Sequence, residues 1–183
     1  AVLNRWNIQI DDSAGMDLDK TPQAVFFRLI AKAVSDKCEN PISLLNLLKN
    51  PYANCGQSAV EFKSNVRKLE IFAMRGIRPS EGFKGYYKQI DSKLATWLES
   101  IEKIIKPLQK LMGYKNVRFD KILATHIKIA QLIADNENQS GVERLWSNDA
   151  GLQLKEFFDE LLISSKDFKE IEPQDYAGLL DAL

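Results

Sequence analysis

Few side chains in this 183-residue chain could carry out chemistry by themselves, and none of them stands in a known catalytic spacing. His126, the only histidine, falls between Thr125 and Ile127 in a helical pattern, which favours a structural role over metal binding. Cys38 and Cys55 lie 17 residues apart without a CxxC spacing, so they indicate neither a zinc site nor a disulfide framework. We expect both cysteines to be buried thiols in a reducing compartment.

The chain also lacks the short motifs that hold phosphates or catalytic metals, namely a P-loop, an HExxH helix and a GxSxG elbow. Its nearest glycine-rich segment, 76–85, is spaced for turns. Asp11 and Asp12 are adjacent, and neighbours on an extended segment point to opposite sides, which favours turn formation or capping over a shared metal ion. We therefore predict no catalytic residue, no cofactor and no metal site in this segment.

Charge is distributed unevenly along the chain, although the formal net charge is zero. Residues 1–59 are balanced, with six Lys/Arg and six Asp/Glu. Residues 60–134 carry fifteen Lys/Arg and seven Asp/Glu, a balance of +8, and residues 135–183 carry four and twelve, a balance of −8. Such a split is compatible with a basic face for a polyanion, and equally with two helical faces that attract each other within the fold.

Five cations gather on and just after a helix expected at about 58–74. They are Lys63, Arg67, Lys68, Arg75 and Arg78. The first two are four residues apart and so share a helical face, while Glu70 could pair with Arg67. Together the cations could bind a phosphate backbone without sequence preference. Aromatic side chains that could stack on bases, or instead anchor the core, follow at Phe83, Tyr86 and Tyr87.

The elements that position these residues are mostly helices, because apolar residues recur at three-to-four spacing. We expect a mainly α, irregular multi-helix domain of about seven helices, with at most one short strand near the N-terminus, at 5–10. The expected helices cover about 21–37, 41–50, 58–74, 87–112, 119–134, 149–163 and 173–183. Pro107 should kink or end the longest of them. The inner face of the 58–74 helix is expected to hold Val60, Phe62, Val66, Leu69, Phe72 and Ala73.

Apolar residues make up 45% of the chain, yet no run approaches the ~18 consecutive apolar residues of a membrane span. This pattern argues against an integral membrane protein, and no secretory signal is visible at the start. We therefore expect a cytoplasmic location. The last segment, 176–183, is apolar and helical without a polar tail, so we expect a piece of a longer protein.

Several short blocks, in order along nearly the whole chain, are similar to one known family. They are WNIQIDDSAG at 6–15, TP at 21–22, FFRLIA at 26–31, PISLLNLLKNPYA at 41–53, LE at 69–70, RGIRP at 75–79, LW at 145–146, AG at 150–151 and YAGLL at 176–180. The blocks resemble AddB in its alphaproteobacterial form, a subunit of the bacterial AddAB helicase–nuclease of double-strand-break repair. Asn50 departs from the family, where histidine is frequent, and this position is only a helix end.

The resemblance implies that residues 1–20 are the edge of a helicase 2A-like domain and that residues 21–183 form a helical 2B-like domain. Such a region would be non-catalytic, and it would support duplex DNA contact and assembly with the AddA subunit, without a membrane or a small-molecule substrate. The ATP-dependent helicase and exonuclease sites of the family would lie elsewhere in the full protein.

Two other interpretations remain open from the residues alone. In the first, the chain is a pure protein–protein interaction scaffold without DNA contact, and its cations are simply solvated. In the second, it is a small autonomous helical enzyme, which the absence of a catalytic motif disfavours.

Overall fold

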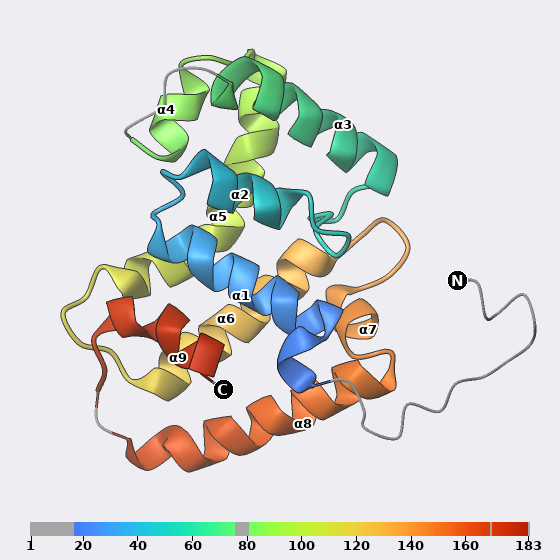
Figure 1. Ribbon diagram of the computed structural model, residues 1–183. Coiled ribbons are helices and arrows are strands. Elements are labelled where there is room, and N and C mark those ends of the chain that lie inside the picture. The colour runs from blue at the N-terminus through green and yellow to red at the C-terminus, as the bar shows by residue number, and fades with distance from the viewer. Residues whose placement is uncertain (1–16, 76–80, 169, 183) are drawn as a thin grey trace, which may run out of the picture.

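The computed structural model describes residues 17–75, 81–168 and 170–182. Within these ranges the chain forms nine α-helices and no β-strand, which confirms the mainly α, multi-helix fold (Figure 1). The helices are α1 (Pro22–Ser35), α2 (Pro41–Leu48), α3 (Ala59–Leu69), α4 (Phe83–Tyr87), α5 (Ser92–Met112), α6 (Phe119–Ala134), α7 (Gly141–Leu145), α8 (Asp149–Ser164) and α9 (Tyr176–Ala182). A π-helix, Glu70–Met74, continues α3. The predicted strand at 5–10 lies outside the described residues.

The start of α5 differs from the prediction, and a side-chain cap explains the difference. The Asp91 carboxylate accepts the Leu94 N–H at 2.8 Å, so the helix begins at Ser92 rather than near residue 87. Residues 83–87 form the separate short helix α4 instead. Together with α7, which is also only five residues long, α4 accounts for the nine helices seen in the described ranges against about seven expected.

Pro107 does not end α5, which continues to Met112, so that alternative of the prediction is wrong. A proline inside a helix lacks the N–H that would bond to the carbonyl four residues earlier, here that of Lys103. Both residues are exposed, so water can satisfy this carbonyl. The hydrogen bond that is missing at the proline therefore lies on the solvent-exposed side of the helix.

The core is centred on aromatic rings where α1 packs on α6, α8 and α9. The Phe27 ring lies 5.1 Å from the His126 ring, 4.8 Å from that of Phe158 and 5.9 Å from that of Trp146, measured between centroids. Tyr176 on α9 closes the cluster, with its ring 5.7 Å from that of His126. All five side chains are buried, and their large apolar areas make this cluster a main source of stability.

The connection between α2 and α3 is tied to the carboxyl end of α6. The N–H groups of Asn54 and Cys55 both reach the Ile133 carbonyl at 2.9 Å, and the Gly56 N–H reaches the Asp135 carbonyl at 2.7 Å. A helix leaves its last carbonyls without partners inside the helix, and these three donors satisfy two of the carbonyls at this end. The same hydrogen bonds fix the loop from which α3 departs.

Arg144 completes this junction from α7. Its half-buried guanidinium donates to the carbonyls of Pro51 and Tyr52, each at 3.0 Å, and to the carbonyl of Ala134 at the end of α6. It also lies over the Tyr52 ring, 5.8 Å from the centroid. One cation thus joins α6, α7 and the α2–α3 loop.

The two charged segments pack on each other through α6, but their outermost helices lie far apart. In Figure 1, α3, in the +8 segment, and α8, in the −8 segment, lie at opposite ends of the molecule. No ion pair between described residues joins 60–134 to 135–183. Within the described part, no ion pair therefore neutralises one segment with the other. Longer-range attraction does cross between them, since the pKa of Arg118 is raised mainly by Asp120, and Asp167 and Glu170 of the −8 segment add to the shift.

Close packing at the start of α7 gives a test of this junction. A Cβ on Gly141 would lie 1.9 Å from the Gln131 carbonyl oxygen of α6, so we expect Gly141→Ala to force the two helices apart. Overpacking of this kind costs about 1–3 kcal/mol or more, which urea unfolding followed by circular dichroism would measure as a loss of unfolding free energy.

Gly178→Ala in α9 is the matched control, because a Cβ there meets no atom within 4 Å. Alanine is the better helix former by about 1 kcal/mol, so this variant should be neutral or slightly stabilised. Equal stability of the Gly141→Ala variant and the parent chain would contradict the packing of α7 on α6.

Candidate anion-binding site

A groove between the end of α2 and the outer side of α3 brings cations from three segments together. It has a volume of about 470 Å³ and is lined by Leu48, Lys49, Lys63, Val66, Arg67, Glu70 and Arg75. Four cationic side chains thus surround one carboxylate, and two aliphatic side chains complete the wall. The volume falls within the range of about 300–1,000 Å³ that is typical of ligand sites.

Glu70 is the only acid of the groove lining, and it is paired on two sides. Lys49 Nζ lies 2.6 Å from one carboxylate oxygen, and Arg75 Nη2 lies 3.5 Å from the other. The hydrogen bond from Lys49, with the added charge of Arg75, holds the pKa of the Glu70 carboxyl below its usual value. These two cations therefore offset the acid, and the pair with Lys49 joins the end of α2 to the π-helix.

Lys63 and Arg67 remain available for an outside anion. Both side chains are exposed, one helical turn apart, and neither makes an ion pair with a residue in the described part of the chain. The apolar side chains of Leu48 and Val66 lie beside them, and Val66 is itself buried. An anion in the groove would therefore meet two uncompensated charges next to a partly apolar wall.

The structure brings three of the five cations predicted from sequence to this groove, namely Lys63, Arg67 and Arg75. Lys68 is exposed on the same helix but does not line the groove, and Arg78 lies outside the described residues. Glu70 pairs with Lys49 and Arg75, rather than with Arg67 as expected.

Sequence reasoning missed Lys49 as part of this site. It follows the last residue of α2, and its distance from Lys63 along the chain gives no sign that the two converge. The only distinctive feature of Lys49 in the sequence is its position just before Asn50-Pro51, where a helix must end.

The aromatic residues considered for base stacking are mostly unavailable. Phe83 and Tyr86 are buried in the core, and the Tyr86 hydroxyl donates to the Cys38 carbonyl at 3.2 Å. Tyr87 is half-buried, and its hydroxyl donates to a Glu102 carboxylate oxygen at 2.5 Å. Burial raises the pKa of Tyr87, and the hydrogen bond to Glu102 adds to the shift. These contacts assign all three to structural roles.

Two residues predicted to face inward from the 58–74 helix are exposed instead. Val60 is 81% exposed and Phe72 is 58% exposed, whereas Ala73 is buried as predicted. Val60 lies in the first turn of α3, two residues before the buried Phe62 and therefore on the opposite side of the helix. Phe72 falls in the π-helix, and the three-to-four spacing of the buried residues runs from Leu69 to Ala73 and leaves Phe72 off the inner face.

His126 carries no chemistry that a ligand could reach. Its side chain is fully buried, and Nδ1 lies 2.8 Å from the Tyr176 hydroxyl oxygen. Burial lowers the pKa of His126 to about 3, against a smaller opposing effect of the Phe27 backbone. The ring is therefore neutral at neutral pH. It packs in the core, which is the structural role that the sequence pattern favoured.

The two cysteines are equally inert. Cys38 is buried, and its sulfur accepts a hydrogen bond from Gln109 Nε2 at 3.6 Å, while Cys55 is partly buried. Burial raises the pKa of each thiol to about 12. A thiol with such a pKa is protonated at neutral pH, and the protonated form is a poor nucleophile and metal ligand.

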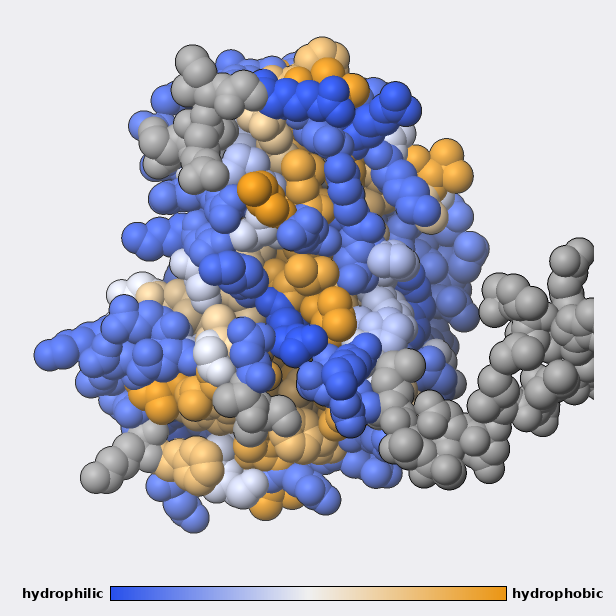
Figure 2. Space-filling model, viewed as in Figure 1, coloured by the Kyte–Doolittle hydropathy of each residue, from blue (hydrophilic) through white to orange (hydrophobic). Residues whose placement is uncertain are grey.

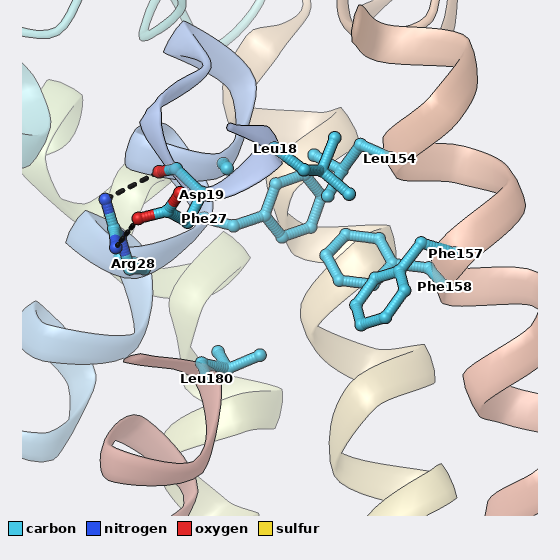
Figure 3. Close-up of a pocket in the computed structure, with 9 residues that line it drawn as sticks. Leu18, Asp19, Phe27, Arg28, Leu154, Phe157, Phe158 and Leu180 are labelled. Atoms are coloured by element: carbon cyan, nitrogen blue, oxygen red, sulfur yellow. Dashed lines mark hydrogen bonds and ion pairs between the residues drawn. The ribbon is translucent and has the colours of Figure 1, made fainter. Parts of the chain in front are cut away.

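A second, smaller pocket lies between α1, α8 and α9. Figure 3 shows the rings of Phe27, Phe157 and Phe158 around it, with Arg28 at its edge bound to Asp19. Arg28 Nη2 donates to the Asp19 carbonyl at 2.7 Å. The space is about 40 Å³, far below the ~300–1,000 Å³ of small-molecule sites, so it is a packing defect rather than a binding site.

Among the described residues there is no cluster of three or more side chains that could bind a metal, and no helix has both the length and the apolar character to cross a membrane. Comparison with protein-family models, curated proteins and solved structures finds no match. The similarity to AddB therefore remains a hypothesis carried by short sequence blocks.

Burial of His126 predicts a pH dependence of stability. The unfolded chain takes up a proton near pH 6.5, but the folded chain does so only near pH 3. Between these values the unfolded state binds more protons, so the free energy of unfolding should fall as the pH is lowered, by up to about 1.4 kcal/mol per pH unit.

Urea unfolding at a series of pH values between 6.5 and about 4 would measure this slope. In the His126→Gln variant the slope should be smaller, because glutamine can still hydrogen-bond to Tyr176 but does not titrate. Carboxylates contribute equally to both proteins and cancel in the comparison. An unchanged slope would show that the histidine is accessible to protons in the folded state.

Proposed function

We propose that this chain is a non-catalytic helical module that binds the phosphate backbone of DNA through the α2–α3 groove. The observation that carries the proposal is the pair Lys63 and Arg67, exposed and without ion-pair partners among described residues, beside an acid already compensated by two other cations. A phosphate entering the groove would gain these contacts without displacing an internal salt bridge. Binding of this kind depends on charge and carries no sequence preference.

The distribution of charge supports the same proposal. Figure 2 shows hydrophilic side chains covering most of the end that α3 occupies, with hydrophobic ones emerging among them. The acidic α8 lies at the other end, where it would repel a polyanion and so favour approach toward α3. A ligand of high negative charge would therefore be both attracted and oriented.

The sequence similarity suggests the assembly in which this module works. As part of an AddB-like subunit, it would hold duplex DNA beside an AddA-like motor in the cytoplasm. Helicase and nuclease chemistry would belong to other parts of that assembly. The buried state of His126 and both cysteines is compatible with a module that acts through shape and charge.

Charge reversal tests the proposal directly. In the double variant Lys63→Glu and Arg67→Glu, we expect weaker binding of a labelled duplex in fluorescence anisotropy at low ionic strength. The plot of log affinity against log salt concentration should also flatten, by about 0.9 for each phosphate contact removed. Because both side chains are exposed, the fold should be unaffected, which circular dichroism would verify.

The matched control is the double variant Lys121→Glu and Lys128→Glu, which makes the same change of charge on the exposed side of α6. It should weaken binding far less, since neither residue lines the groove. Equal losses in both double variants would mean that only the overall charge matters, and the assignment of the groove would then be wrong.

A protein-interaction scaffold is the second candidate, because the exposed residues include large aliphatic side chains on the two helices that border the groove. Ile42 on α2 is 62% exposed and Val60 on α3 is 81% exposed. On this alternative, the reversal of Lys63 and Arg67 would leave capture of an AddA-like partner intact, and duplex binding by the parent chain would be absent even at low salt.

A further inference from the structure

The outer side of α3 carries a stripe of exposed side chains that is apolar at both ends and cationic in the middle. Val60 is 81% exposed, and Ile71, in the π-helix that continues α3, is 41% exposed. Ser64, Arg67 and Lys68 are exposed between them at three-to-four spacing, which places all five on one side of the helix. We call these five residues the basic stripe. The buried residues of α3 lie on the other side and are Phe62, Val66 and Leu69.

α8 carries a stripe with the same pattern and the opposite charge, which we call the acidic stripe. Leu152 is 49% exposed and Ile163 is 67% exposed. Glu156, Asp159 and Glu160 are exposed between them, again at three-to-four spacing. Both stripes are turned away from the core, since the buried residues of α8 also lie on the other side of their helix. They are Gly151, Leu154 and Phe158.

The two stripes match in length. The apolar residues at the ends are 11 residues apart in each, Val60 and Ile71 on one helix and Leu152 and Ile163 on the other. Eleven residues make about three helical turns and rise about 16 Å. Two helices laid side by side can therefore bring apolar side chains together at both ends of the contact, with opposite charges facing each other between them. Opposite charges beside apolar contacts set the choice of partner in paired helices.

The charges of both stripes are available to a partner. Among the described residues, no ion pair involves Lys68, Glu156 or Glu160. Asp159 pairs with Lys155 of its own helix at 2.5 Å, and both side chains are about half exposed. Exposed pairs of this kind contribute little, so the pair does not hold Asp159 back from a partner.

The stripes cannot meet within one molecule, because α3 and α8 lie at its opposite ends (Figure 1). We infer that the basic stripe of one molecule binds the acidic stripe of a second copy, so that molecules associate end to end. Each contact joins two different surfaces of identical chains, which leaves one stripe free at each end for a further copy. With five residues a side, against the ~20–30 of a stable interface, the association is weak. The inference goes beyond the proposed function and requires no DNA.

Sedimentation velocity of the chain without DNA tests the inference. At low ionic strength, the mean sedimentation coefficient should rise as the protein concentration is raised toward about 1 mM, which detects even a millimolar dissociation constant. Added salt should lower it, because salt screens exposed charges. The double variant Glu156→Lys and Glu160→Lys should raise the dissociation constant about tenfold or more, since two attractions become repulsions.

The double variant Ser64→Glu and Lys68→Glu should weaken association to the same degree from the other side. Neither residue lines the groove, so duplex binding remains a separate measurement. The chain that carries all four substitutions should associate as the parent does, because its two stripes have exchanged their charges. If that chain stays monomeric while the parent associates, the pairing of these two stripes is wrong.

The double variant Glu137→Lys and Glu172→Lys is the matched control, because it makes the same change of charge at exposed acids of the −8 segment outside the stripe. It should associate as the parent does. If the parent is monomeric at every concentration, or if the control loses association as strongly as the α8 variant, the inference is overturned and the proposed function still stands on its duplex binding. If the chain associates but binds no duplex, the proposed function fails and the inference stands.

Discussion

The carboxyl end of α6 is the point on which the arrangement of the molecule depends. A helix that ends inside a protein leaves carbonyls that must find donors, and each one left buried without a partner costs about 1–3 kcal/mol. Here the donors come from the α2–α3 loop and from Arg144. The loop whose N–H groups bond to these carbonyls also leads into α3. The need to pair the carbonyls therefore fixes where α3 lies against α2. The candidate groove is a consequence of that placement.

Within the groove, a local ion-pair arrangement decides which charges are left for a ligand. Glu70 pairs with Lys49 and Arg75, and its pair with Lys49 joins the end of α2 to the π-helix. Lys63 and Arg67 make no ion pair with any described residue. The same acid thus stabilises the wall of the groove and leaves its remaining cations uncompensated. Exposed ion pairs contribute little to stability, so the importance of this arrangement lies in shape and charge.

The groups that usually carry chemistry are withdrawn from solvent in this fold. Burial keeps His126 neutral within the aromatic cluster of α1, α6, α8 and α9, and keeps the thiols of Cys38 and Cys55 protonated. The charged side chains remain on the surface, where α3 of the +8 segment and α8 of the −8 segment lie at opposite ends. A molecule of this kind can act by recognising and orienting a charged partner, and its long-range field contributes to the encounter as well as to the contact.

Helical periodicity by itself determined the fold class and most helix ranges, including α6 at Phe119–Ala134, because the spacing of apolar residues is a local property. Periodicity also placed Lys63 and Arg67 on one face. It could not place Lys49 beside them, since that contact depends on how the α2–α3 loop binds to α6. The expectation that Phe72 lies inside was wrong, because the spacing of Phe62, Val66 and Leu69 continues to Ala73 and leaves Phe72 off the buried face. Local patterns therefore predicted the elements, whereas the convergence of cations arose only from hydrogen bonds and packing between distant segments.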